Sequence, residues 1–189
     1  MVNGDVEQEV SQEKPNIVDE ICDWINSMLF GIFVVLIIFT FVVKQVRVDG
    51  RSMLPTLETG QRLFVSSWFY TPENGDIVVA KSESLNKNII KRVIAKEGQE
   101  VDIDFEKGIV YVDGEQLYEP YINNLTRLDE HGHDYPVIVP DNCYFVMGDN
   151  RMESKDSRSP EIGFVKKEDI VGKAIFRWLP FSKFGGLYD

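Results

Sequence analysis

The chain has 189 residues, enough for one ordinary domain with an appendage. Apolar residues make up 43% of it and charged residues 27%, a balance typical of a folded protein and not of a disordered one. Its 20 basic residues are outnumbered by 31 acidic ones, which argues against a nucleic-acid partner because phosphates require a basic face. The two cysteines, Cys22 and Cys143, lack the spacing of a zinc site, and we expect both to be unpaired.

The N-terminal part of the chain divides into an acidic tail, residues 1–23, and an apolar segment, residues 24–43. The apolar segment, WINSMLFGIFVVLIIFTFVV, has no charge in 20 residues. A helix of that length spans roughly 30 Å, the hydrocarbon thickness of a bilayer. Trp24 at one end and Lys44 just beyond the other suit the two membrane interfaces. The sequence therefore predicts a single transmembrane anchor.

Two other interpretations of this segment fit less well. A buried helix of a globular protein seldom stays apolar on all sides for so long. A cleavable signal peptide has a shorter apolar region, and VVKQVRV offers no small-x-small cleavage site. The orientation is harder to predict, because Lys44, Arg47, Arg51 and Arg62 follow the segment and only Lys14 precedes it. By the positive-inside rule, this distribution weakly favours a cytoplasmic C-terminal part.

From residue 44 onward the pattern is typical of β-strands separated by turns. Apolar or alternating runs recur in QRLFVSSWF, TPENGDIVVAK, NIIKRVIA, YPVIVPDNCYFVMGDN and DIVGKAIFRWLPF, bounded by turn-forming residues. The clearest hairpin is in GIVYVDGEQL, where Asp113 and Gly114 suit a type I′ turn. The sequence therefore predicts a mainly β protein, with an antiparallel β domain over residues 44–189 behind one N-terminal transmembrane helix.

Two residues of this domain could form a nucleophile and its base. Ser52 lies in GRSMLPTLETG, where a serine could equally cap a turn. Lys91 lies in NKNIIKRVIAKEG, a mostly apolar strand whose alternation places Ile89, Lys91 and Val93 on one face. A lysine on an apolar face loses hydration, which disfavours its charged form and lowers its pKa. A neutral amine can act as a general base for a serine hydroxyl.

A third stretch, GDNRMESKDSRSPEIG, contains charged residues that could form ordinary surface ion pairs in a solvated loop. The alternative is a structured loop held by charge-assisted hydrogen bonds between its aspartates and arginines. Ser154 in this loop could then exchange a hydrogen bond with a buried amine. Taken alone, the stretch does not decide between the two.

In combination, SMLPTL, KRVIAKEGQEV and GDNRMESKDSR behind an N-terminal anchor resemble the bacterial type I signal peptidases. The flanking phrases GDIVV, VYVDGEQLYEPYI and IVGKAIFRWLP are similar to the same family, so the resemblance covers roughly residues 43–180. It implies a β domain of the signal-peptidase type and a membrane-bound serine endopeptidase that removes signal peptides from secreted pre-proteins. It also implies cleavage after small residues, no cofactor, no metal, and a monomer in the lipid bilayer.

The resemblance further implies roles for individual residues. Ser52 matches the nucleophile, Lys91 the general base and Ser154 the serine that orients the lysine amine. Two charge pairs match those that hold the catalytic loop: Asp149 with Arg92, and Asp156 with Arg158. A further set matches the residues that line the pockets for the substrate's −1 and −3 side chains: Val48, Met53, Ile89 and Ile90.

The sequence departs from the family pattern near the nucleophile. One branch of the family has a serine two positions before the nucleophile that donates into the oxyanion hole, and this chain has Gly50 there. The hole must then depend on the Ser52 backbone N–H, and the loss of one donor typically costs about 3 kcal/mol. The interval from Lys91 to Gly148 is also short, so the extra subdomain of larger relatives is reduced to a hairpin. Relatives in the endoplasmic reticulum have histidine in place of Lys91, so the bacterial type fits better.

The implied function predicts a cytoplasmic N-terminal tail and an extracytoplasmic catalytic domain, against the weak charge bias. Three other hypotheses stay open from the residues. A serine protease could use His131 or His133 in DEHGHD as its base. The chain could instead be a membrane-tethered β module that binds peptides without cleaving them. A soluble Ser/Lys autoprotease would share the same two residues, but it would need neither the anchor nor GDNRMESKDSR.

Overall fold

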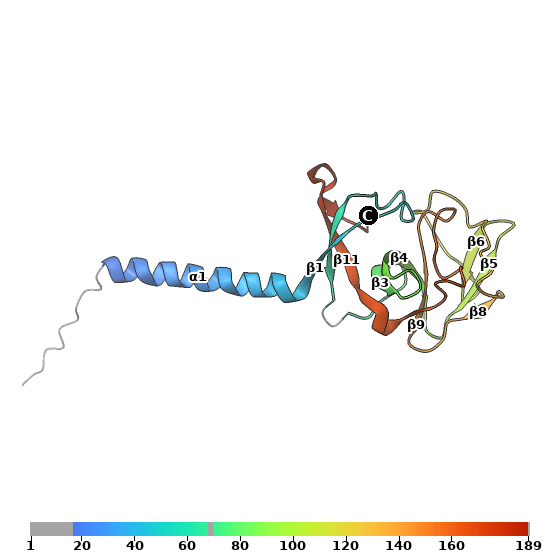
Figure 1. Ribbon diagram of the computed structural model, residues 1–189, viewed down its shortest axis with the longest axis horizontal. Helices are drawn as coiled ribbons and strands as arrows, with labels where there is room; N and C mark the ends of the chain where they lie inside the picture. The colour runs from blue at the N-terminus through green and yellow to red at the C-terminus, as the bar shows by residue number, and fades with distance from the viewer. Residues whose placement is uncertain (1–16, 68–69, 189) are drawn as a thin grey trace, which may run out of the picture. The chain divides into compact units, whose positions relative to one another are not determined.

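The computed structural model describes residues 17–67 and 70–188, without the side chains of residues 38–42. It contains one long helix, and a compact β domain begins at Phe41. The elements are shown in Figure 1, and their bounds are α1 Ile17–Val42, β1 Val43–Arg47, β2 Arg62–Ser66, β3 Ile77–Ser82, β4 Lys87–Lys96, β5 Glu100–Asp104, β6 Ile109–Val112, β7 Glu115–Gln116, β8 Val137–Ile138, β9 Cys143–Met147, β10 Val165–Lys166, η1 Lys167–Asp169, β11 Ile170–Leu179, η2 Phe181–Lys183 and β12 Gly185–Gly186.

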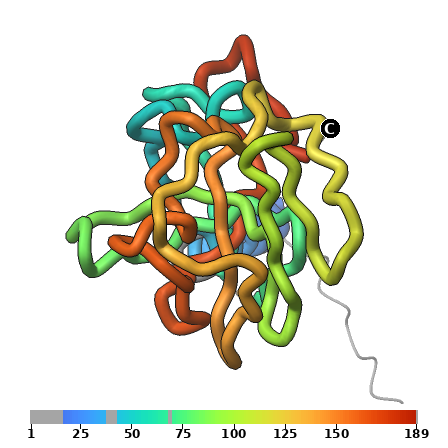
Figure 2. The backbone as a smooth tube through the Cα atoms, turned by 90° about the vertical axis from the view of Figure 1, so that its right-hand side faces the viewer, coloured from blue at the N-terminus to red at the C-terminus, as the bar shows by residue number. Residues whose placement is uncertain are grey.

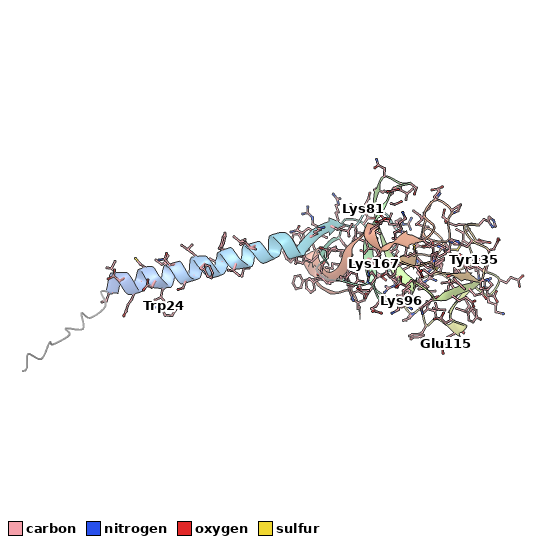
Figure 3. The ribbon with its side chains drawn as sticks, turned by 90° about the horizontal axis from the view of Figure 1, so that it is seen from below. Trp24, Lys81, Lys96, Glu115, Tyr135 and Lys167 are labelled. Atoms are coloured by element: carbon pink, nitrogen blue, oxygen red, sulfur yellow. The ribbon has the colours of Figure 1, made fainter. Side chains whose placement is uncertain are left out.

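Helix α1 begins at Ile17, inside the segment that we expected to be a tail; residues 1–16 of that segment lie outside the described residues. Asp19 and Glu20 occupy its first turn, where carboxylates interact favourably with the positive end of the helix dipole. Residues Ile17–Ile37 are long and apolar enough to cross a membrane, judged by length and composition. Trp24 projects from the helix and is 79% exposed (Figure 3).

The β domain contains two antiparallel sheets. The larger sheet has the strand order β1-β2-β11-β3-β4-β9-β10, with β12 added to β11. The smaller sheet has the order β7-β6-β5-β8. Figure 1 shows β5, β6 and β8 on the side of the domain away from β1 and β11. The prediction of a mainly β, antiparallel protein is therefore confirmed.

The smaller sheet contains the hairpin that we predicted from local sequence. β6 and β7 pair with Val112 opposite Glu115, and the turn between them is Asp113-Gly114. Both turn residues have positive φ, 52° and 79°, as a type I′ turn requires. This backbone conformation twists in the same sense as the strands that it connects, so the turn sets their register.

Strand β4 lies at the junction of the domain's apolar clusters. Ile90 packs against the cluster around Leu57 and Leu63, and Ile89 belongs to the cluster around Val146. Further along the same strand, Ile94 belongs to a third cluster, which includes Phe145. A strand with apolar neighbours on both faces excludes water from the residues between them. The turn that joins β3 to β4 projects from the rest of the domain (green in Figure 2).

Candidate active site

The loop after β1 holds Ser52 against the core. Met53 and Leu57 are buried in the first apolar cluster, and Leu57 N–H donates to the Met53 carbonyl at 2.8 Å. Gly50 has a φ of +95°, a conformation that favours glycine, and its carbonyl accepts a hydrogen bond from Thr59 Oγ1 at 2.7 Å. Ser52 is therefore held by buried neighbours on its C-terminal side and by a constrained turn on its N-terminal side.

Lys91 of β4 reaches Ser52 directly. Its Nζ atom is 2.7 Å from Ser52 Oγ, and the residue is only 4% exposed. Burial is the main cause that lowers the pKa of Lys91 from 10.5 to about 8. The negative charge of Asp156 opposes this shift, and the positive charge of Lys87 adds to it. The amine thus lies within hydrogen-bond distance of the hydroxyl, and it binds a proton much more weakly than an exposed lysine does.

Two buried charge pairs stand behind these residues. Arg92 forms a bidentate contact with Asp149, with Nε and Nη2 at 2.9 and 2.7 Å from the two carboxylate oxygens. Arg158 Nε lies 2.9 Å from Asp156 Oδ1. Burial alone would raise the pKa of Asp156, but the hydrogen bond and charge of Arg158 reverse this and hold it below its ordinary value. Both predicted pairs are thus present, with all four residues buried.

Asp156 and Arg92 connect these pairs to the rest of the domain. The Gly148 N–H donates to Asp156 Oδ2 at 2.9 Å, so the second pair fixes the start of the Gly148–Arg158 loop. Arg92 Nη1 donates to the Gly75 carbonyl, and its guanidinium lies 3.9 Å from the centre of the Tyr121 ring. These contacts satisfy the donors of a buried guanidinium, which removes much of its desolvation cost.

Ser154 lies next to the nucleophile loop. A Cβ atom added to Gly148 would stand 2.2 Å from Ser154 Oγ and 2.4 Å from the Ser52 carbonyl oxygen, so only glycine permits this approach. Ser154 Oγ is close enough to the Asp156 carboxylate to help lower its pKa, but it makes no hydrogen bond of normal geometry within the described residues. The predicted hydrogen bond from Ser154 to the Lys91 amine is therefore not formed in this structure.

Ser52 and Lys91 line a groove with a volume of about 600 Å³. Its lining includes Ser52, Lys91 and the whole set of predicted pocket residues, Val48, Met53, Ile89 and Ile90. Two strands with open edges flank it. Within the described residues, β1 pairs only with β2, and residues 87–91 of β4 pair only with β3, because the pairing of β4 with β9 starts at Arg92. The groove thus combines apolar pockets with unpaired main-chain groups within the described chain.

The comparison with known proteins bears on this site. Residues 21–179 match the family described as "Signal peptidase, peptidase S26". The chain belongs to this signal peptidase family. "Probable signal peptidase I-1" of Synechocystis sp. is 39% identical over 175 residues, covering 86% of this chain and 85% of that protein. "Signal peptidase I T" of Bacillus subtilis is 34% identical over 170 residues, covering 85% and 86%. A crystal structure of a signal peptidase I from Enterococcus faecalis has 29% identity and a TM-score of 0.47, covering 55% of this chain and 97% of that one.

One residue that joins the loops of this candidate site was not singled out by the sequence. The Asn150 N–H donates to the Ser52 carbonyl at 3.0 Å, and its Nδ2 donates to the Arg51 carbonyl at 3.1 Å. Asn150 thereby joins the nucleophile loop to the Gly148–Arg158 loop. It stands inside GDNRMESKDSR, so the motif contained the residue, but nothing in the local pattern indicated what it binds.

A second contact missed from the sequence involves Arg151. Its guanidinium is fully buried and contacts Glu119, Thr126 Oγ1 and the Gly148 carbonyl. The Gly148–Arg158 loop is therefore attached to the 117–128 segment as well as to the core. The two histidines lie elsewhere: His131 pairs with Asp129, and the His133 ring packs against aromatic side chains.

Proposed function

We propose that this member of the signal peptidase family uses Ser52 as nucleophile and Lys91 as general base to remove signal peptides from secreted pre-proteins. The observation that supports the proposal is the 2.7 Å distance between Lys91 Nζ and Ser52 Oγ at a buried lysine whose pKa falls to about 8. An amine with this pKa is partly neutral near physiological pH and can accept the hydroxyl proton. The similar proteins named signal peptidase I support the substrate class.

The reaction then proceeds in two halves. Neutral Lys91 takes the Ser52 proton as Oγ attacks the carbonyl of the scissile bond, and the protonated amine passes the proton to the leaving amine. Water then hydrolyses the acyl-enzyme with Lys91 again acting as base. The Ser52 N–H donates to no group within the described chain, so it is available to the oxyanion. Gly50 has no side chain that could supply a second donor.

The substrate segment binds in the groove as an additional strand. The open edges of β1 and of residues 87–91 of β4 offer main-chain donors and acceptors to an extended peptide. Val48, Met53, Ile89 and Ile90 surround the side chains that precede the cleaved bond. Their apolar, confined pockets admit alanine-sized groups and exclude large ones.

The buried charge pairs keep the two reactive groups at this distance. Asp149 with Arg92 and Asp156 with Arg158 hold the Gly148–Arg158 loop against the core, so their role is to position the site. The role that we propose for Ser154, beside Gly148, is to orient the lysine amine during the reaction. The tight contact at Gly148 limits how far Ser154 can be from Ser52.

We further propose that the protein is anchored in the membrane. Helix α1 anchors the protein as a single pass, with residues 1–23 in the cytoplasm and the domain of residues 44–189 outside. This arrangement places the site on the side where a translocated signal peptide presents its cleavage site. We propose that the protein acts as a monomer.

Cleavage of a purified pre-protein by the full-length chain in detergent tests the dyad. We expect Ser52→Ala and Lys91→Ala to abolish cleavage, while His131→Ala and His133→Ala cleave normally at the same mapped bond. Unfolding curves of each variant separate a loss of chemistry from a loss of fold. Normal cleavage by Lys91→Ala together with inactive histidine variants would favour the histidine-dependent protease. Absence of cleavage by wild type and Ser52→Ala alike would favour a module that only binds peptides.

External protease added to intact spheroplasts tests the topology. We expect the β domain to be digested and residues 1–23 to be protected. Survival of the β domain would overturn the proposed orientation and agree with the distribution of Lys and Arg around the anchor.

A further inference from the structure

The groove is richer in positive charge than the rest of the chain. The protein carries a formal net charge of −11, yet the charged residues that line the groove beside Lys91 are four basic and two acidic. Arg51 lies 3.5 Å from Glu153, and Lys155 contacts Glu161, so two of the cations have acidic partners. Lys87 and Arg47 have no ion pair with any described residue. The groove therefore has cations without an acidic partner among the described residues.

The sheet topology places Lys87 relative to the substrate. The antiparallel steps β1-β2, β2-β11, β11-β3 and β3-β4 make β1 and β4 run in the same direction. β1 leads toward Ser52, and β4 leads from Lys87 toward Lys91. A peptide whose small side chains precede the cleaved bond and occupy these pockets must run in that direction as well.

The strand repeat then identifies the position that Lys87 faces. Residues 87, 89 and 91 share one face of β4, because side chains alternate along a strand. Lys87 is four residues before Lys91, or about 13 Å along the strand. If residue P1 immediately precedes the cleaved bond and lies beside Lys91, residue P5, four positions earlier, lies beside Lys87.

Lys87 is exposed, at the first position of β4, next to the projecting turn shown in Figure 2. Its charge is felt at the catalytic centre, since it is among the groups that lower the pKa of Lys91. A substrate carboxylate near Lys87 would gain a partner without displacing an existing one. An exposed pair of this kind is worth a few-fold in affinity.

We propose that Lys87 selects pre-proteins with an acidic side chain at P5. This inference rests on the proposed function, because it requires the groove to hold the segment before the cleaved bond. It adds a charge preference at a position beyond the −1 and −3 pockets.

Three peptides that differ only in Glu, Gln or Lys at P5 test the inference with the full-length chain in detergent. We expect wild type to cleave the Glu peptide about threefold faster than the Gln peptide in kcat/KM, and the Lys peptide more slowly. Lys87→Glu should invert this order, with the Lys peptide best. In 1 M salt the wild-type preference should shrink toward unity, because the screening length falls to about 3 Å.

Lys81→Glu is the matched control, because Lys81 is an exposed lysine of the neighbouring strand β3 that does not line the groove (Figure 3). It introduces the same change of net charge and should keep the wild-type order of the peptides. Equal rates for all peptides with wild type, or an order that Lys87→Glu does not change, would overturn the inference while leaving the proposed function in place. Failure of wild type to cleave any of the peptides would overturn both.

Discussion

Replacement of Lys91 by methionine tests whether burial keeps this amine uncharged. The side chains have similar length, and methionine removes the charge. Lys91 is 4% exposed, and its pKa falls from 10.5 to about 8. Because one unit of pKa corresponds to about 1.4 kcal/mol, the folded state at pH 7 is destabilised by about 3 kcal/mol when it holds this proton. We therefore expect Lys91→Met to be inactive and more stable than wild type at pH 7.

The sign of the pH dependence follows from the direction of this shift. Between pH 8 and pH 10.5 the unfolded chain keeps the proton on Lys91, whereas the folded chain has lost it. Wild type therefore gains stability as the pH rises through this window, and Lys91→Met lacks that gain. Relative to its value at pH 7, the stability difference between the variant and wild type should shrink by about 1.4 kcal/mol at pH 9 and by about 2.5 kcal/mol at pH 10.

Denaturant unfolding of both full-length proteins in detergent micelles, followed by circular dichroism at pH 7, 8, 9 and 10, measures this difference. The lost hydrogen bond to Ser52 and the change in packing contribute equally at every pH, so the trend reports the proton alone. Lys81→Met, at an exposed position of β3, is the control for the removal of a lysine charge without burial. A difference between Lys91→Met and wild type that stays constant from pH 7 to 10 would refute the argument that burial displaces the lysine proton.

Three further predictions concern the same site. Below pH 8, kcat/KM should rise about tenfold per pH unit and level off above it, as expected of a base with the pKa of Lys91; a flat profile between pH 6 and 9 would contradict that role. Arg92→Met leaves the buried Asp149 carboxylate without its cation, so the free energy of unfolding should fall by about 3–5 kcal/mol in denaturant titrations. A loss below about 1 kcal/mol would argue against a structural role for this ion pair. Gly148→Ala places a methyl group against Ser154 Oγ and the neighbouring backbone. We expect kcat/KM for cleavage to fall at least about 100-fold and the free energy of unfolding to fall by about 1–3 kcal/mol. Full activity would mean that the loop can shift freely.

Features that depend on near neighbours could be predicted from the sequence. The turn at Asp113-Gly114 has the expected positive φ angles because two adjacent residues decide its type. The long apolar helix follows from composition, although its start at Ile17 does not, because polar residues can extend a helix when their propensity and charge permit. Charge-assisted bonds in the Gly148–Arg158 loop could be considered from its residues, but the specific partners of Asp149 and Asp156 were expected only through a family resemblance. Asn150 and its two bonds to the nucleophile loop had no local signal at all.

The sequence by itself determined the kind of protein: an apolar helix, alternating strands and the combination of motifs that marks the signal peptidase family. Only the tertiary structure decided that Lys91 stands 2.7 Å from a hydroxyl 39 residues earlier in the chain and loses nearly all contact with water. Periodicity and composition act over a few residues, whereas this distance and this burial depend on how distant strands and loops pack around β4.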